Sequence, residues 1–210
     1  MRRGLDHLIR PGELEPPTVV QLQIGEYRVS RSPEVLYTLL GSCVAVCLYD
    51  AAAGIGGMNH ILLPGRAEDE GRFEDVARFG LDAVELLVRA LVDAGAARRR
   101  LTSKLFGGGH VIRQMDEVTS PGFRNVQFIR ELMTKERIPV VASDLGGYEA
   151  RKVWFRTDTA DVILKRVPVK LVAAVRREEG EFRRQALEKV RGGNRTVNPT
   201  PGHPRGARTP

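Results

Sequence analysis

Apolar and polar residues alternate over Thr18–Val29, and this two-residue period predicts a half-buried β-strand. Two short apolar runs follow, at Val44–Tyr49 and Ile55–Leu63. The intervening Asp50-Ala51-Ala52-Ala53-Gly54 is typical of a turn, so the two runs are predicted to form a β-hairpin.

A helical period replaces the strand period further along the chain. One apolar stripe predicts a helix over Phe73–Ala94, with Gly95 placed to end it, and a second helix is predicted over Arg124–Arg137. Four more short strands are predicted, at Ser103–Phe106, Pro139–Ala142, Lys152–Arg156 and Val162–Arg166. Strands that surround two helices without repeated βαβ alternation favour an α+β layered domain.

The length of 210 residues suits one domain with appendages. We expect a flexible N-terminal arm over 1–17, a folded domain over 18–174 and a disordered, basic tail over 175–210, in which Glu179–Val190 could form a short helix. No apolar run reaches the roughly 18–20 residues of a membrane span, and no signal peptide is evident. The expected location is the cytoplasm, without insertion into a membrane.

The net charge of +7 is concentrated in the tail, because residues 170–210 hold ten Lys or Arg and only four Asp or Glu. The rest of the chain is therefore nearly neutral, which argues against a nucleic-acid-binding body. We interpret the tail as a solvated appendage; binding of a polyanion or a membrane surface by the tail is the alternative.

Only two cysteines are present, Cys43 and Cys47. In one strand their Cα atoms would lie about 13 Å apart, whereas a disulfide needs about 7 Å or less. Their spacing also differs from that of a zinc site, and no second ligand pair follows. Both are predicted to be thiols, and Cys47, with apolar neighbours in mid-strand, is assigned to the core.

Cys43 and His60 are the candidate chemical pair. Gly41 and Ser42 predict a tight turn before the thiol, with backbone N–H groups that could stabilise an oxyanion. A hairpin could bring His60 beside Cys43, as a cysteine nucleophile requires. The competing interpretation is a small buried cysteine and a structural histidine.

Several motifs occur in an order that resembles the CheD family of chemoreceptor glutamine deamidases. They are Leu40-Gly41-Ser42-Cys43-Val44-Ala45-Val46-Cys47-Leu48-Tyr49-Asp50, Gly57-Met58-Asn59-His60, Phe106-Gly107-Gly108-Gly109, Gly122-Phe123-Arg124-Asn125-Val126, Asp144-Leu145-Gly146-Gly147 and Arg151-Lys152-Val153-Trp154-Phe155. The resemblance covers about residues 20–168.

The resemblance implies Cys43 as nucleophile, His60 as general acid and base, and Thr38 as the residue that orients the histidine. It implies conversion of receptor glutamines to glutamates through a thioester, without a metal or organic cofactor. The implied partners are the cytoplasmic helices of chemoreceptors and a CheC-type phosphatase. The implied fold is a β-sandwich-like core with helices outside, similar to the catalytic domain of cytotoxic necrotizing factor toxins.

Two alternatives to deamidation stay open. A cysteine protease or acyltransferase would use the same pair of side chains, and a non-catalytic adaptor would bind receptors or a CheC-type phosphatase. The chain also departs from the family pattern at Tyr148-Glu149 and at His110, which we interpret as a solvated loop histidine.

Overall fold

The computed structural model describes residues 17–63, 73–111, 116, 118–167, 177, 181 and 184. Nine strands lie within these residues: β1 Thr18–Gln21, β2 Tyr27–Ser30, β3 Glu34–Leu40, β4 Val44–Asp50, β5 Ile55–Ile61, β6 Thr102–Gly107, β7 Val140–Leu145, β8 Ala150–Arg156 and β9 Val162–Val167. Two α-helices accompany them, α1 Phe73–Asp93 and α2 Pro121–Lys135, with a short 3-10 helix at Arg98–Arg100.

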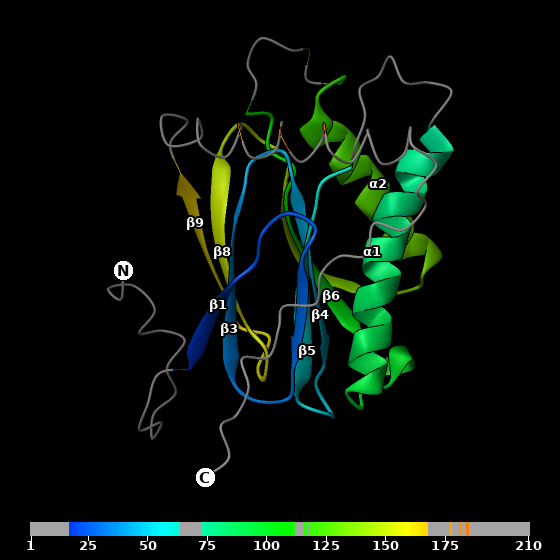
Figure 1. Cartoon of the computed structure of the whole chain (residues 1–210), viewed down its shortest axis with the longest axis vertical. Coiled ribbons are helices and arrows are strands. Elements are labelled where there is room, and N and C mark those ends of the chain that lie inside the picture. The colour runs from blue at the N-terminus through cyan, green and yellow to red at the C-terminus, as the bar shows by residue number, and fades with distance from the viewer. Residues whose placement is uncertain are drawn as a thin grey trace.

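The strands form two sheets. One sheet has the order β1-β3-β8-β9 and the other has the order β2-β5-β4-β6-β7. The predicted hairpin is present, because β4 and β5 pair antiparallel from Asp50↔Ile55 to Val44↔Ile61. Figure 1 shows the two sheets side by side, with α1 and α2 covering only the outer face of the sheet that contains β5, β4 and β6.

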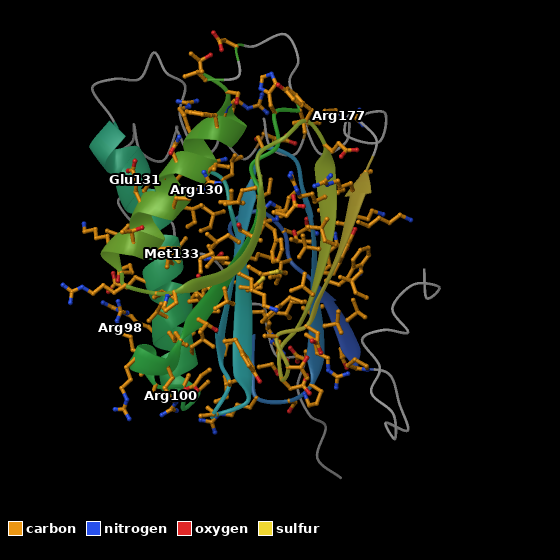
Figure 2. All side chains as sticks on the ribbon, turned by 180° about the vertical axis from the view of Figure 1, so that it is seen from behind. Arg98, Arg100, Arg130, Glu131, Met133 and Arg177 are labelled. Atoms are coloured by element: carbon orange, nitrogen blue, oxygen red, sulfur yellow. The ribbon has the colours of Figure 1, made fainter. Side chains whose placement is uncertain are left out.

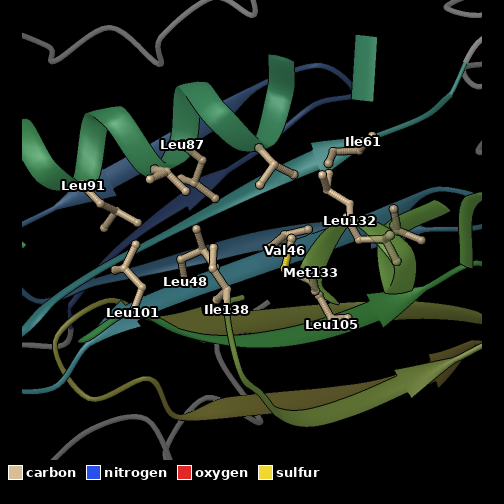
Figure 3. Close-up of a cluster of buried hydrophobic side chains, with 14 of the residues drawn as sticks. Val46, Leu48, Ile61, Leu87, Leu91, Leu101, Leu105, Leu132, Met133 and Ile138 are labelled. Carbon is tan, nitrogen blue, oxygen red and sulfur yellow. The ribbon is translucent and has the colours of Figure 1, made fainter. Parts of the chain in front are cut away.

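The molecule therefore has three layers, and a separate apolar cluster fills each of the two gaps between them. The cluster between the sheets includes Leu36 and Phe155 from one sheet and Ala45 and Met58 from the other. The cluster between the second sheet and the helices contains Leu87 of α1 and Leu132 of α2, packed against Val46 and Leu105 (Figure 3). This arrangement confirms the expected α+β fold with a sandwich core and helices outside. The proposed similarity to cytotoxic necrotizing factor stays a prediction.

Helix α2 is amphipathic, as its sequence pattern requires. Ser120 caps its N-terminus by accepting a hydrogen bond from the Phe123 N–H, and Pro121 occupies the first turn, where a missing N–H costs nothing. Figure 2 shows Arg130 and Glu131 on the exposed side of the helix, whereas Met133 is buried. The helix thus begins three residues before the predicted boundary, because sequence reasoning overlooked the Ser-Pro start signal.

One predicted strand was wrong. Thr18–Val29 is not a single strand but two, β1 and β2, which belong to different sheets. The chain crosses between the sheets over residues 22–26, and Gly25 adopts the left-handed backbone conformation (φ 84°) in that crossing. Strand β3, which the sequence analysis did not predict, follows and pairs with β1 and β8.

Other predicted elements shift by a few residues at most, including the helix that becomes α1. An ion pair ties the β4–β5 turn to the 3-10 helix, since the fully buried carboxylate of Asp50 contacts the guanidinium of the exposed Arg100 at 2.7 Å. Arg98 and Arg100 both lie at this end of the molecule (Figure 2). The predicted arm over 1–17 and the predicted helix within 179–190 fall, apart from residues 17, 181 and 184, outside the described residues.

Candidate functional site

Thr38 and His60 meet in the gap between the two sheets. Thr38 lies on β3 in one sheet and His60 on β5 in the other, and Thr38 Oγ1 is 2.8 Å from His60 Nδ1. Both residues are buried, with His60 only 4% exposed. The structure therefore brings together two of the three residues that the family resemblance implied.

A second hydrogen bond fixes the direction of the first. The Thr38 hydroxyl has one proton, which it donates to the Leu22 carbonyl oxygen at 3.0 Å. The same hydroxyl oxygen must then accept at its other contact, so His60 Nδ1 carries the proton and donates it. His60 is consequently the tautomer in which Nε2 has an unshared lone pair.

His60 Nε2 is buried and has no hydrogen-bond partner among the residues that the structure describes. Burial lowers the pKa of His60 to about 4, opposed by hydrogen bonding to the Leu22 backbone. The imidazole is therefore neutral at pH 7, with Nε2 able to accept a proton. A buried nitrogen without a protein partner is uncommon and is characteristic of a site that acts on another molecule.

Cys43 lies on the same face of the sheet as His60. Ala45 pairs directly with His60, and the β4–β5 ladder ends at Val44. Alternate residues of an extended segment share a face, so one further step in the same register makes Cys43 a diagonal neighbour of His60. Cys43, Ala45, Met58 and Leu62 accordingly belong to one inter-sheet cluster. Diagonal neighbours have Cβ atoms about 7 Å apart, within reach of a thiol and an imidazole that point toward one another.

Cys47 is the other diagonal neighbour of His60 on β4, so position alone does not separate the two thiols. Their surroundings do. Cys47 lies in mid-strand, and burial raises the pKa of its thiol far above the usual range, although Lys104 opposes this. Cys43 lies just before β4, in the Gly41-Ser42-Cys43 turn. Neither cysteine forms a disulfide.

The carbonyl groups of the Gly41-Ser42-Cys43 turn each accept a hydrogen bond. The Gly109 N–H donates to Gly41 O at 2.8 Å and the Gly108 N–H donates to Cys43 O at 2.7 Å. Asn125 Nδ2 of α2 donates to Ser42 O at 2.7 Å. The turn that precedes the thiol is thus held in one conformation from two sides.

Two glycines allow these close approaches. A Cβ atom at Gly107 would lie 2.2 Å from Cys43 O, and one at Gly122 would lie 2.5 Å from Gly109 O. Side chains at these positions would push the glycine-rich segment and the start of α2 away from the thiol turn. The sequence motifs that contain these glycines therefore meet around Cys43.

His110 is not the solvated loop histidine that the sequence suggested. It is 7% exposed, and its ring packs edge-on against Tyr148 with the centroids 5.7 Å apart. His110, Gly108 and Ser120 line a cavity of about 170 Å³ beside α2. The prediction was wrong because Gly147 accepts a backbone hydrogen bond from His110 and draws this segment against the chain after β7.

Sequence reasoning also missed Asn125 and Leu22. Asn125 was noticed only as part of a motif, and no sequence signal shows that it reaches Ser42. Leu22 acts through its backbone carbonyl, which no side-chain pattern reveals. No group of three or more His, Cys, Asp or Glu side chains in the described part of the chain could hold a metal ion. None of the helices described is long and apolar enough to span a membrane.

A thiol and an oriented, neutral imidazole on one inter-sheet face define a candidate thiol-dependent acyl-transfer site in a sandwich domain. A family model described as "CheD chemotactic sensory transduction" matches residues 62–166. The chain is 45% identical over 162 residues to the "Probable chemoreceptor glutamine deamidase CheD 2" of Chromobacterium violaceum, covering 77% of this chain and 80% of that protein.

Two further relatives agree. The "Probable chemoreceptor glutamine deamidase CheD" of Paraburkholderia xenovorans is 40% identical over 181 residues, covering 86% of this chain and 69% of that protein. "Probable chemoreceptor glutamine deamidase CheD 1" of Shewanella oneidensis is 38% identical over 178 residues, covering 84% and 86%. The chain belongs to the CheD family. The match to the family model begins after Cys43 and His60, so it does not assign their roles.

Proposed function

We propose that this chain is a protein-glutamine deamidase that converts glutamine side chains of chemoreceptors to glutamate. Membership of the CheD family and the printed names of the relatives support this function. The observation that carries the residue assignment is the Thr38–His60 hydrogen bond, because it leaves His60 Nε2 as a base on the face that holds Cys43.

In the first half of the proposed reaction, Cys43 Sγ attacks the carboxamide carbon while its proton passes to His60 Nε2. The resulting tetrahedral intermediate collapses when His60 returns this proton to the nitrogen, and ammonia leaves. The enzyme then holds a γ-glutamyl thioester on Cys43. His60 serves as base and then as acid, which its neutral resting state allows.

In the second half, His60 Nε2 takes a proton from water, whose oxygen attacks the thioester carbon. The carbon–sulfur bond breaks, and the proton returns to Cys43 Sγ. The net reaction consumes one water molecule and produces glutamate and ammonium, because the proton that leaves the new carboxyl group is taken up by the released ammonia. Thr38 keeps the proton on Nδ1 in both halves and thereby keeps Nε2 available.

The proposed role of Gly41 and Ser42 is to hold the turn beside the reacting carbon. Backbone donors stabilise an oxyanion best when their direction is fixed before the reaction, because no energy is then needed to reorganise them. The hydrogen bonds to the carbonyls of Gly41, Ser42 and Cys43 provide such fixation. Cys43 is fully buried, so a substrate glutamine reaches it only after a local opening.

The proposed substrates are glutamines in the cytoplasmic helices of chemoreceptors, which places the protein in the cytoplasm. Each converted position gains a negative charge, and its new carboxylate can be methylated. We also propose that a CheC-type phosphatase is a partner, as the family resemblance implies.

The test measures ammonia release and Gln-to-Glu conversion in a purified receptor cytoplasmic fragment. Cys43→Ala and His60→Ala should each abolish both signals while the melting temperature shows a folded protein. Cys47→Ala is the matched control, because it removes the other thiol diagonal to His60 and should keep its activity. Activity in Cys43→Ala would refute the assigned nucleophile.

The same experiment separates the alternatives. Deamidation adds about one dalton to the fragment without cleaving it, whereas a protease would cut the chain. A non-catalytic adaptor would leave the mass of the fragment unchanged and would still bind it after Cys43→Ala.

A further inference from the structure

Asn125 joins the two segments that carry the proposed nucleophile and base. Its Nδ2 donates to Ser42 O at 2.7 Å, and its Oδ1 accepts from the Leu63 N–H at 3.2 Å. Ser42 immediately precedes Cys43, and Leu63 follows His60 by three residues. Asn125 lies on α2 and is only 1% exposed, so both bonds are shielded from water.

The carboxamide lies where the β4–β5 ladder would have continued. The ladder ends at Val44↔Ile61, and two further steps in the same register would pair Ser42 with Leu63. At this position the structure has Ser42 O, the Asn125 carboxamide and the Leu63 N–H in series. The carboxamide therefore bridges the two segments beside the thiol turn.

The carboxamide satisfies both partners in this orientation at any pH, whereas an ionised carboxylate does not. Asn125 has a donor facing a carbonyl and an acceptor facing an N–H, and reversing the group would oppose like with like at both ends. A carboxylate could still accept from Leu63 but could not donate to Ser42. An alanine would leave both buried backbone groups without this partner, which is costly.

From these contacts we propose that Asn125 is a positioning residue, which sets the placement of the Cys43 turn relative to the strand of His60. This inference rests on the proposed function, because it assumes that Cys43 and His60 react together. Asn125 does not touch the reacting atoms. It acts through the Ser42 carbonyl, and since a trans peptide points its C=O and N–H in opposite directions, fixing this carbonyl also fixes the direction of the Cys43 N–H.

Asn59 provides a matched control. It is also a buried asparagine (2% exposed) that links the sheet to a helix, with Oδ1 accepting from the Val46 N–H at 3.0 Å and Nδ2 donating to Ala83 O at 3.1 Å. Its two bonds resemble those of Asn125 in number and kind, but they do not involve the thiol turn.

The experiment measures kcat and KM for deamidation of the receptor fragment, corrected for the folded fraction, in Asn125→Asp, Asn125→Ala and Asn59→Ala. At pH 7 both Asn125 variants should lose at least tenfold in kcat with KM changed less than threefold. Asn59→Ala should lower the melting temperature comparably but keep kcat within twofold. Asn125→Asp should regain activity relative to the unsubstituted protein toward pH 5, because a protonated carboxyl can again donate to Ser42.

A kcat within twofold of the unsubstituted protein in Asn125→Asp, with Cys43→Ala inactive, would overturn the role of Asn125 and leave the proposed function intact. An equal loss in Asn59→Ala would also overturn it, since the effect would then be general destabilisation. Full activity in Cys43→Ala would instead refute Cys43 as the nucleophile, and no Gln-to-Glu conversion by the unsubstituted protein would refute the proposed function. If Asn125→Ala does not fold, the near-isosteric Asn125→Asp alone decides between these outcomes.

Discussion

Replacing Thr38 by valine tests the origin of the histidine tautomer. Valine has nearly the shape of threonine but lacks the hydroxyl, so the change removes the bonds to His60 Nδ1 and to Leu22 O while the methyl packing stays. Each buried hydrogen bond contributes about 1 kcal/mol net, and an unsatisfied buried partner costs about 1–3 kcal/mol. We therefore expect Thr38→Val to lower the free energy of unfolding by about 2–4 kcal/mol.

Thr38→Val should lower kcat/KM by more than the decrease in the folded fraction accounts for. Without the Thr38 oxygen, only the Leu22 backbone remains to hold the proton on Nδ1. A larger fraction of His60 then carries the proton on Nε2, and that tautomer cannot accept the thiol proton. A loss of about 1.4–2.8 kcal/mol in transition-state stabilisation corresponds to about 10- to 100-fold in kcat/KM. The assay is ammonia release from a receptor fragment, normalised to the folded fraction measured by urea denaturation.

Thr38→Ser is the control for this prediction, because serine keeps the hydroxyl and loses only a methyl group. It should retain most of the activity and lose less stability than the valine variant. The reasoning would be refuted if folded Thr38→Val deamidated at the unsubstituted rate, or if serine were as inactive as valine.

Three further predictions concern pH, the ion pair and the glycine contact. His60 has a pKa lowered to about 4; in the unfolded chain it titrates near 6.5, so its contribution to stability is complete above about pH 6.5 and falls toward pH 4 by up to about 1.4 kcal/mol per pH unit. Urea denaturation should show this slope, and a flatter slope in His60→Gln. In the activity assay, kcat/KM should rise with pH through a group that titrates near 4. An inflection in kcat/KM only near pH 6.5 would contradict the lowered pKa of His60. The Arg100 guanidinium and the Ala97 and Ala53 N–H groups lower the pKa of Asp50. Asp50→Asn should therefore reduce the free energy of unfolding by about 2–3 kcal/mol at pH 7 and by less below about pH 4, as measured by denaturation at both pH values. An equal reduction at both pH values would argue against a contribution from the Asp50 charge. Gly122→Ala should reduce kcat through the clash with Gly109 O. Because this clash pushes α2 away from the thiol turn, it should also speed alkylation of the buried Cys43 thiol. An unchanged kcat would show that α2 can shift without moving the thiol turn.

Local sequence patterns predicted those helices and strands whose apolar residues repeat with the period of the element and face the core. The β4–β5 hairpin, both α-helices and the later strands follow from apolar periodicity and turn residues, which act over short distances. The division of Thr18–Val29 into two strands could not be predicted in this way, because one alternating pattern serves equally well for two strands in different sheets. Strand β3 is buried at most of its positions, and such a strand shows little alternation.

The candidate site was likewise predictable only in part. Cys43 and His60 stand out by residue type, and their common face follows from the hairpin register. Thr38 is 22 residues from His60 in sequence and reaches it only through the packing of two sheets. Asn125 is 83 residues from Ser42, and only the docking of α2 brings them together. These contacts depend on tertiary structure that one sequence does not specify by pattern.

The bond between Thr38 and His60 has a consequence for how the protein acquires activity. Because it joins β3 of one sheet to β5 of the other, it can form only when the two sheets have docked. A folding intermediate with a complete β4–β5 hairpin would contain both Cys43 and His60 and would still lack a defined base. Recovery of deamidation during refolding would therefore time the closure of the sandwich, separately from the formation of its secondary structure.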